Sequence, residues 1–316
     1  MKKFISAALA VIIMLSLCAC TAKKQTALVI SGTEINTEIF TYFLDKVINR
    51  PTDYGLTEKP SKKEIKQAAI TECKEYLAAN TEFRNIGLSL SAADKLAISD
   101  NVNSFWIRFK NHYDKIGVSK QTLTKILTAQ AYKDAIFTAN YDRGVGNKAA
   151  EEELTEFFYS NYVCFRTVCA YYTSPDGSTP LTQLEKTELL DKFRQIKEDS
   201  GTDLDKFSDV VAAAGYTLSD SIVLKKGSDG YPEGFFEKVY AFEDGKVEII
   251  AEDDCVFAVY KENLKEKGES VYATYRSSCI SDLYSAESDA KTDEFIATMT
   301  VEENGNTADR IIDKLS

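Results

Sequence analysis

Cysteine and histidine are the residue types in this chain whose number and spacing bear most directly on chemistry. The sequence has seven cysteines and one histidine, His112. Apart from Cys18 and Cys20 near the start, five cysteines remain, and their redox state is left open by the sequence: Cys73, Cys164, Cys169, Cys255 and Cys279. An odd number with no short CxxC pair argues against a disulfide framework and against a structural zinc site.

Two further patterns bear on metal and nucleotide binding. His112 has no second histidine and no nearby cysteine, and it falls near a predicted helix end before Gly117, which indicates a surface or C-terminal capping residue. Arg143-Gly144-Val145-Gly146 superficially resembles the start of a phosphate-binding loop. A helical pattern precedes it and the third glycine is absent, which argues against nucleotide binding. We therefore expect no metal, no nucleotide and no cofactor.

The first twenty residues indicate export. Two lysines precede an apolar run from Phe4 to Leu17, which is too short for an ordinary membrane-spanning helix. The ending Leu17-Cys18-Ala19-Cys20 resembles a bacterial lipobox, which implies cleavage before Cys20 and acylation of its thiol. The alternative is an ordinary signal peptide, with Cys20 a chance thiol. We expect a leader at 1–19, a tether at 20–26, and two acyl chains holding the protein on the extracytoplasmic face of the cell membrane.

Charge narrows the range of partners. The formal net charge is −11, and it becomes more negative once Lys2 and Lys3 leave with the leader. An acidic surface repels phosphate backbones, so nucleic acid is not an expected partner.

A small α/β unit at 163–264 must position Cys169 and Cys255. The run at 163–172 predicts a buried strand that ends at a turn, and five residues separate Cys164 from Cys169, so that they point to opposite faces. The runs 246–250 and 255–260 predict a closing hairpin across an acidic turn. Between these lie two predicted helices, at 181–199 and 203–214, and a strand at 221–224.

Helical patterns flank this unit on both sides. Before it, a strand at 27–30 leads to a helix from about Asn36, and capping sequences at Ser61, Ser91 and Ser119 open three more, with a last one at 151–162. After it, a helix runs from 269 to about 298. The third helix carries an apolar stripe that predicts helix core, with a surface for binding client proteins as the alternative: Leu96, Val102, Trp106, Phe109 and Tyr113.

The order strand, helix, helix, strand, helix, strand, strand resembles the parvulin-type peptidyl-prolyl isomerase domain. The residues that carry this resemblance are Gly230, Phe235, Phe236, Ala241, Phe242, Gly245 and Val247. The opening strand, glycine turn and amphipathic helix resemble PrsA-type foldase lipoproteins and SurA-like chaperones. The resemblance implies an α+β fold in which a mainly helical, discontinuous chaperone-like domain, 27–162 with 265–316, carries an inserted parvulin-like domain at 163–264.

The site residues depart from this family. Parvulin isomerases place one histidine on the first strand and one on the last, and these positions fall here near Val168 or Cys169 and near Cys255 or Val256. Cys169 and Cys255 are interpreted as small core residues, because a free cysteine among apolar strand residues is usually a core residue. By resemblance, Phe235, Phe236 and Phe242 would contact a bound peptide, with core packing expected for at least one.

Three functions are consistent with these patterns. The first is a membrane-anchored foldase or chaperone that binds unfolded or newly exported polypeptides without isomerase chemistry. The second is an active peptidyl-prolyl cis-trans isomerase, since a pocket can twist an imide without acid–base groups. The third is an envelope lipoprotein that uses the fold as a scaffold.

Overall fold

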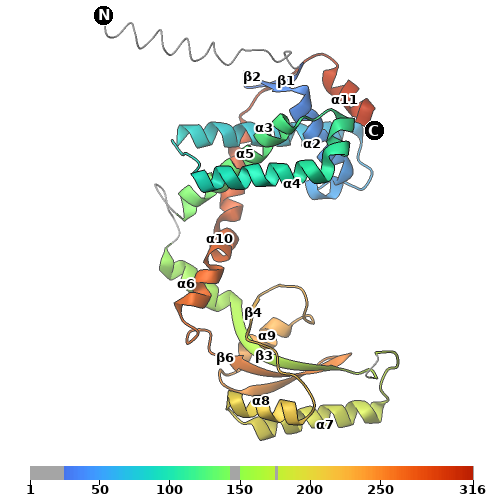
Figure 1. Cartoon of the computed structure of the whole chain (residues 1–316), viewed down its shortest axis with the longest axis vertical. Helices are drawn as coiled ribbons and strands as arrows, with labels where there is room; N and C mark the ends of the chain where they lie inside the picture. Colours follow the sequence, from blue (N-terminus) through green and yellow to red (C-terminus); the bar gives the residue numbers. More distant parts are fainter. Residues whose placement is uncertain (1–24, 143–149, 175–176, 316) are drawn as a thin grey trace, which may run out of the picture. The chain divides into compact units, whose positions relative to one another are not determined.

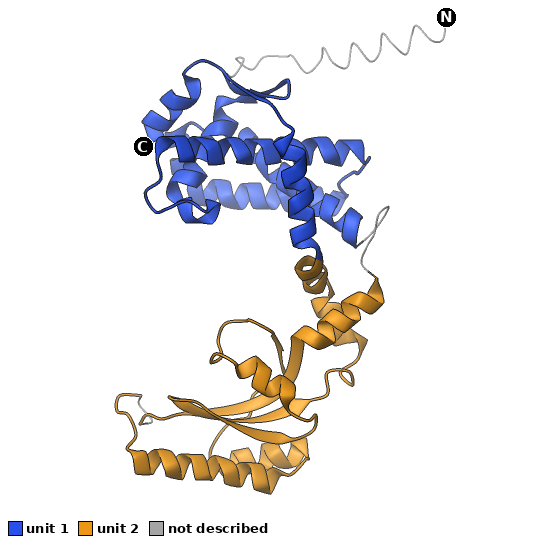
Figure 2. Ribbon diagram, turned by 180° about the vertical axis from the view of Figure 1, so that it is seen from behind, with its two compact units in different colours: residues 1–148, 284–316 blue, residues 149–283 orange. Residues whose placement is uncertain are grey.

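The computed structural model describes residues 25–142, 150–174 and 177–315. The predicted leader, Cys20 and the Arg143–Gly146 motif lie outside the described residues. The chain divides into two compact units, one from 1–148 with 284–316 and the other from 149–283 (Figure 2). The chain thus begins the first unit, builds the whole second unit, and then completes the first. The inserted domain predicted at 163–264 falls within the second unit.

The first unit combines a small antiparallel sheet with several helices (Figure 1). Its elements are β1 (Thr26–Ile30), β2 (Thr33–Asn36), α2 (Thr37–Asn49), the short 3-10 helix η2 (Pro51–Tyr54), α3 (Lys62–Asn85), α4 (Ala92–Ile116), α5 (Lys120–Tyr141), β7 (Val301–Glu303) and α11 (Thr307–Leu315). The strand order is β2-β1-β7, with Ile30 opposite both Thr33 and Val301. The central strand therefore pairs with its sequence neighbour on one side and with a strand from near residue 300 on the other.

Amphipathic helices form the core of this unit around the sheet. The buried side chains of α2 recur at helical spacing and pack with residues of β1, α3 and α11: Ile39, Phe40, Phe43, Leu44 and Val47. The capping box expected at the start of α3 is present, because the Ser61 side chain accepts from the Glu64 N–H at 3.3 Å and the Glu64 carboxylate accepts from the Ser61 N–H at 2.7 Å. Ser91 and Asp94 repeat this arrangement at the start of α4.

The second unit is built on a four-stranded antiparallel sheet of order β4-β3-β6-β5. Its elements are α6 (Glu151–Asn161), β3 (Tyr162–Tyr171), α7 (Gln183–Ser200), α8 (Leu204–Ala213), β4 (Ile222–Lys225), α9 (Phe235–Ala241), β5 (Val247–Ala251) and β6 (Cys255–Glu262), followed by α10 (Glu269–Ala297). Helices α7 and α8 cover one face of the sheet and α9 covers the other (Figure 1). Residues of α10 up to 283 belong to this unit and later ones to the first.

The two faces of this sheet make two cores because neighbouring side chains on a strand point to opposite sides. Phe165 and Phe257 pack with Phe235 of α9, whereas Val168 packs with Phe193 of α7. The predicted α+β class is confirmed, and the elements within 163–264 follow the predicted order.

Among the described elements, four short ones were not expected from the sequence: β2, η2, β7 and α11. In the parts of the chain that the structure describes, no helix is both long and apolar enough to cross a membrane.

Candidate functional site

A cavity of about 700 Å³ in the second unit follows the later half of β3. It brings together the two cysteines that the sequence singled out, Cys169 and Cys255. The cavity is lined by Thr167, Val168, Cys169, Tyr171, Tyr216, Thr217, Leu218, Ser219, Ile222, Gly230, Tyr231, Pro232, Asp254, Cys255 and Phe257. Most of this lining is apolar or aromatic, as in pockets that bury the side chains of a ligand.

Cys169 and Cys255 are diagonal neighbours on the α9 face of the sheet. Cys169 lies opposite Phe257 and Tyr171 lies opposite Cys255 in the β3–β6 ladder, and both thiols are free. Burial raises the pKa of the Cys169 thiol. Burial, together with a hydrogen bond involving Asp254, raises the pKa of Cys255 to about 12. Both thiols are therefore protonated at neutral pH, and neither is a ready nucleophile.

The aromatic residues that face the cavity differ from those suggested by resemblance. Tyr231 and Phe257 line it, whereas Phe235 packs behind them with its ring centroid 4.4 Å from that of Tyr231 and 5.0 Å from that of Phe257. Phe236 is also buried, with its ring centroid 5.7 Å from Tyr240, and Phe242 is partly buried against the same cluster. Phe235 thus supports the cavity from beneath. Tyr231 was missed because it precedes the phenylalanine motif.

The single histidine lies in the other unit. His112 is 44% exposed, and its Nε2 lies 2.8 Å from the Asp45 carboxylate of α2. Its predicted surface position is confirmed, but its hydrogen-bond partner lies on a different helix and could not be read from the local sequence. Among the described residues that line the cavity of the second unit, none is a histidine.

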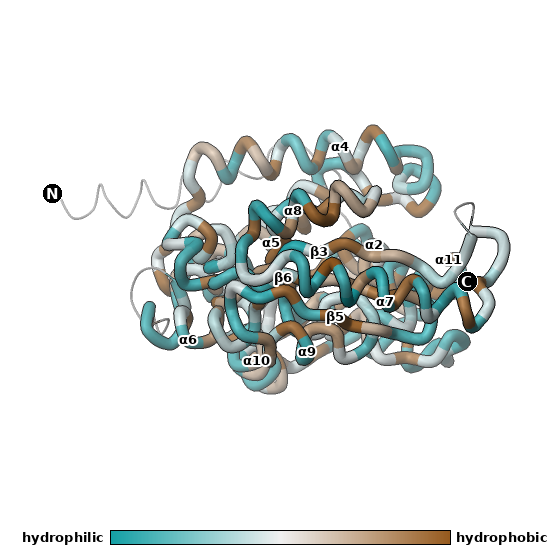
Figure 3. The backbone as a smooth tube through the Cα atoms, turned by 90° about the horizontal axis from the view of Figure 1, so that it is seen from below, coloured by the Kyte–Doolittle hydropathy of each residue, from teal (hydrophilic) through white to brown (hydrophobic). Residues whose placement is uncertain are grey.

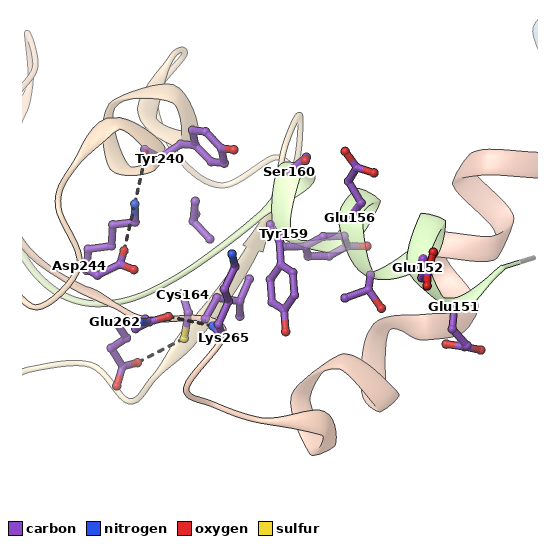
Figure 4. Close-up of a pocket in the computed structure, with 16 residues that line it drawn as sticks. Glu151, Glu152, Glu156, Tyr159, Ser160, Cys164, Tyr240, Asp244, Glu262 and Lys265 are labelled. Carbon is purple, nitrogen blue, oxygen red and sulfur yellow. Dashed lines mark hydrogen bonds and ion pairs between the residues drawn. The ribbon is translucent and has the colours of Figure 1, made fainter.

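A second cavity, of about 1050 Å³, lies where α6 joins β3 and β6 ends (Figure 4). Its α6 side carries the acidic residues Glu151, Glu152 and Glu156, and its strand side carries Lys261 and Lys265. Glu151 is held by Arg276 of α10 at 2.5 Å, and Lys261 donates to the Tyr240 carbonyl oxygen at 2.9 Å. No local sequence pattern indicates this cavity, because its walls come from segments far apart in the chain.

A buried carboxylate forms the floor of this second cavity. Glu262 is 5% exposed, and it accepts hydrogen bonds from Lys267 at 2.5 Å, from the Cys164 thiol at 3.3 Å and from the Ser221 hydroxyl. Arg166 lies 3.5 Å away. Burial alone would raise the pKa of Glu262, but these donors outweigh it and the pKa is lowered. Glu262 is thus an ionised anchor that joins β3, β6 and the segment before β4.

Helix α4 of the first unit exposes large apolar side chains. Leu96 is 63% exposed, Phe105 43%, Ile107 82% and Phe109 38%, and the helix shows alternating hydrophobic and hydrophilic segments (Figure 3). Of the predicted stripe, Val102 and Tyr113 are buried, and Trp106 stacks on Tyr113 with centroids 6.0 Å apart. The expectation of helix core is therefore wrong for Leu96 and Phe109, because the packing partners of α4 cover only part of its surface.

No protein-family model and no curated protein sequence matches this chain. Among solved structures, the chain is similar to foldase protein PrsA from Lactococcus lactis, with 12% identity over 93% of this chain and 100% of that one and a TM-score of 0.39. PrsA from Streptococcus pneumoniae gives 12% identity over 90% of each chain and a TM-score of 0.34. A SurA-like chaperone structure from Campylobacter jejuni gives 10% identity over 89% of this chain and 100% of that one, with a TM-score of 0.31.

These structural neighbours are foldases and chaperones by name. At such low identities and TM-scores, the likeness assigns no function to this chain.

Proposed function

We propose that the protein is an extracytoplasmic, lipid-anchored foldase or chaperone that binds unfolded or newly exported polypeptides. The observation that carries this proposal is the cavity beside β3, where Tyr231, Phe257 and Ile222 face a space of about 700 Å³. Unfolded polypeptides differ from folded ones in exposing apolar side chains, and burying these in such a lining releases water from both surfaces. Binding of this kind is weak and broad.

The exposed side chains of α4 support the same proposal. Isolated apolar residues are normal on a protein surface, but Phe105 and Phe109 have ring centroids 6.1 Å apart and lie one helical turn from each other. They offer a second binding surface, which lies in the first unit, for an apolar segment of a client polypeptide.

We propose further that binding is not accompanied by prolyl isomerase chemistry. The thiols at Cys169 and Cys255 are protonated at neutral pH, and His112 belongs to the other unit. An active isomerase would have to lower the barrier of about 20 kcal/mol by desolvating and twisting the imide alone.

The test is suppression of aggregation by the purified full-length chain during refolding of a client enzyme, followed by light scattering. We expect suppression by the wild type, weaker suppression by Tyr231→Ala, and no loss in Leu184→Ala. Leu184 is a matched control because it is 69% exposed on α7, outside the cavity lining. Equal suppression by Tyr231→Ala and the wild type would contradict the assignment of the cavity. No suppression by any variant would favour the scaffold alternative.

Isomerase activity is measured on the same preparation with a proline-containing peptide. We expect the relaxation to stay at the uncatalysed time of tens to hundreds of seconds. A catalysed rate that is lost in Cys169→Ala or Phe236→Ala would instead place the protein among the isomerases.

A further inference from the structure

One edge of the sheet in the second unit is only partly paired. Strand β3 has ten residues but β4 has four, and β4 pairs only with residues 162–165. Farther along, the Thr167 N–H donates to the Ser219 hydroxyl at 2.9 Å and the Thr167 carbonyl accepts from the Ser219 N–H at 3.0 Å. Thr173 then forms a bridge with Pro180. That bridge is bonded through the Tyr172 carbonyl and the Ser174 N–H. On the β4 side of β3, the edge is therefore closed at Ser219 and has no strand paired to it beyond Thr167 among the described residues.

The direction of the main-chain groups on this edge follows from the alternation of an antiparallel strand. The Tyr172 N–H donates to the Asp254 carbonyl at 2.8 Å, so the even-numbered residues of β3 bond to β6. Thr167 bonds on the opposite side. Cys169 and Tyr171, which share the alternation of Thr167, direct their N–H and C=O groups away from β6. Within the described ranges, no backbone hydrogen bond joins these four groups to a partner.

The cavity of about 700 Å³ follows this same stretch. Its lining includes Cys169 and Tyr171 of β3 and the segment Tyr216–Ser219. In this segment Ser219 hydrogen-bonds to β3, and no backbone hydrogen bond of the described residues joins 216–218 to the strand. Tyr171 is 64% exposed. The unpaired main-chain groups therefore belong to two residues that border the cavity, and apolar side chains flank them.

We propose that a polypeptide binds here in an extended conformation, as an added strand alongside residues 169–171 of β3. The inference rests on the function proposed above and specifies how the ligand is held. Two N–H groups and two C=O groups at strand spacing are matched by the main chain of an extended segment, whereas a helix uses its own main-chain groups internally. Main-chain recognition is independent of sequence, as binding to many clients requires.

We take the added strand to run antiparallel to β3, as all the described strand pairs of this sheet do. This orientation sets which ligand side chains face which side. Residues directly opposite each other on antiparallel strands share a face of the sheet. Ligand residues opposite Cys169 and Tyr171 therefore meet the α9 face, where Tyr231 and Phe257 line the cavity. The residue between them meets the other face, near Leu218. The ligand residues opposite Cys169 and Tyr171 donate their N–H groups to β3, so proline is accepted only at the intervening position.

The test uses the full-length chain and a blocked heptapeptide of serine, threonine and valine with one central tyrosine that fixes the register. Each backbone nitrogen of the peptide is methylated in turn, and affinity is measured by calorimetry. Methylation at alternate positions near the centre should weaken binding about fivefold or more, since each removes one donated hydrogen bond, while the intervening positions should change little. Binding without this alternation would refute the added strand and leave the proposed function standing. Absence of binding by the unmethylated peptide would refute both.

A variant of the protein tests the same edge from the other side. Tyr171→Pro removes an N–H that faces away from β6, which edge strands tolerate, and Tyr171→Ala removes the same side chain but keeps the N–H. We expect the unmethylated peptide to bind the proline variant about fivefold more weakly than the alanine variant. Equal affinity in two variants with matching thermal melts would also overturn the proposal. If the proline variant does not fold, the methylation series on the wild type decides.

Discussion

Phe235→Ala tests whether the α9 face of the sheet is a core or a binding surface. The Phe235 ring is 1% exposed, and its centroid lies 4.4 Å from Tyr231, 5.0 Å from Phe257 and 5.6 Å from Phe165. Replacing a buried phenylalanine by alanine costs about 3–5 kcal/mol in the free energy of unfolding, because a cavity remains. Domains have a total stability of about 5–15 kcal/mol, so the second unit would lose a large part of its own.

The position of the only tryptophan makes the effect on each unit measurable. Trp106 lies on α4 in the first unit, so its fluorescence follows that unit, whereas far-UV circular dichroism follows both. With a denaturant dependence of about 1.5 kcal/mol per molar urea, the midpoint of the second unit should fall by roughly 2–3 M. The tryptophan transition should stay where it is.

The control is Leu184→Ala, an exposed position on α7 whose substitution should change stability by less than about 0.5 kcal/mol. If Phe235→Ala shifted the dichroism midpoint no more than this control, Phe235 would not be a core residue and the resemblance-based binding role would regain support. If the tryptophan transition moved by the same amount as the dichroism, the two units would unfold as one, and the reasoning from separate cores would be wrong.

Three further predictions concern charge, anchoring and thiols. Since the folded-state pKa of Glu262 is lowered from 4.5, its stabilising contribution is present above about pH 4.5 and lost as pH falls through the folded value. Glu262→Gln should therefore lose about 2–3 kcal/mol at pH 7, because Lys267 loses its partner, and show a flatter acid limb in urea titrations at several pH values. Cys20→Ala should release the protein from the membrane fraction or stall its processing, and a variant processed and retained like the wild type would remove the lipoprotein hypothesis. Cys255 and Cys169 should react with a disulfide reagent at pH 8 far more slowly than after unfolding in urea, and equal rates would show that burial does not protect them.

Much of the fold was predictable because its signals are local. The serine caps at Ser61 and Ser91 need only a carboxylate three residues later, and the strand at 162–171 follows from its own apolar run. Strands β2 and β7 were missed because they are four and three residues long and are stabilised by pairing with β1. Their formation depends on a partner in space, which local propensity does not report.

The site was predictable in part for the same physical reason. Cys169 and Cys255 could be placed near each other by resemblance, and both line the cavity. The unpaired edge could not be foreseen, because it depends on where β4 stops and on Ser219 meeting Thr167. The environment of Glu262 likewise brings together donors from three separate segments.

The pairing of β1 with β7 sets an order in which the two units become complete as the chain emerges during synthesis. Residues 149–283 are contiguous, so the second unit has all its strands before residue 284 appears. The sheet of the first unit has two strands from residue 36 onward but acquires its third only when Val301–Glu303 is available. Until then, the exposed edge of β1 and the apolar face that α11 covers have no native partner. We propose that this protein binds incompletely folded chains. For most of its own synthesis, it is itself an incomplete chain with an unpaired strand edge.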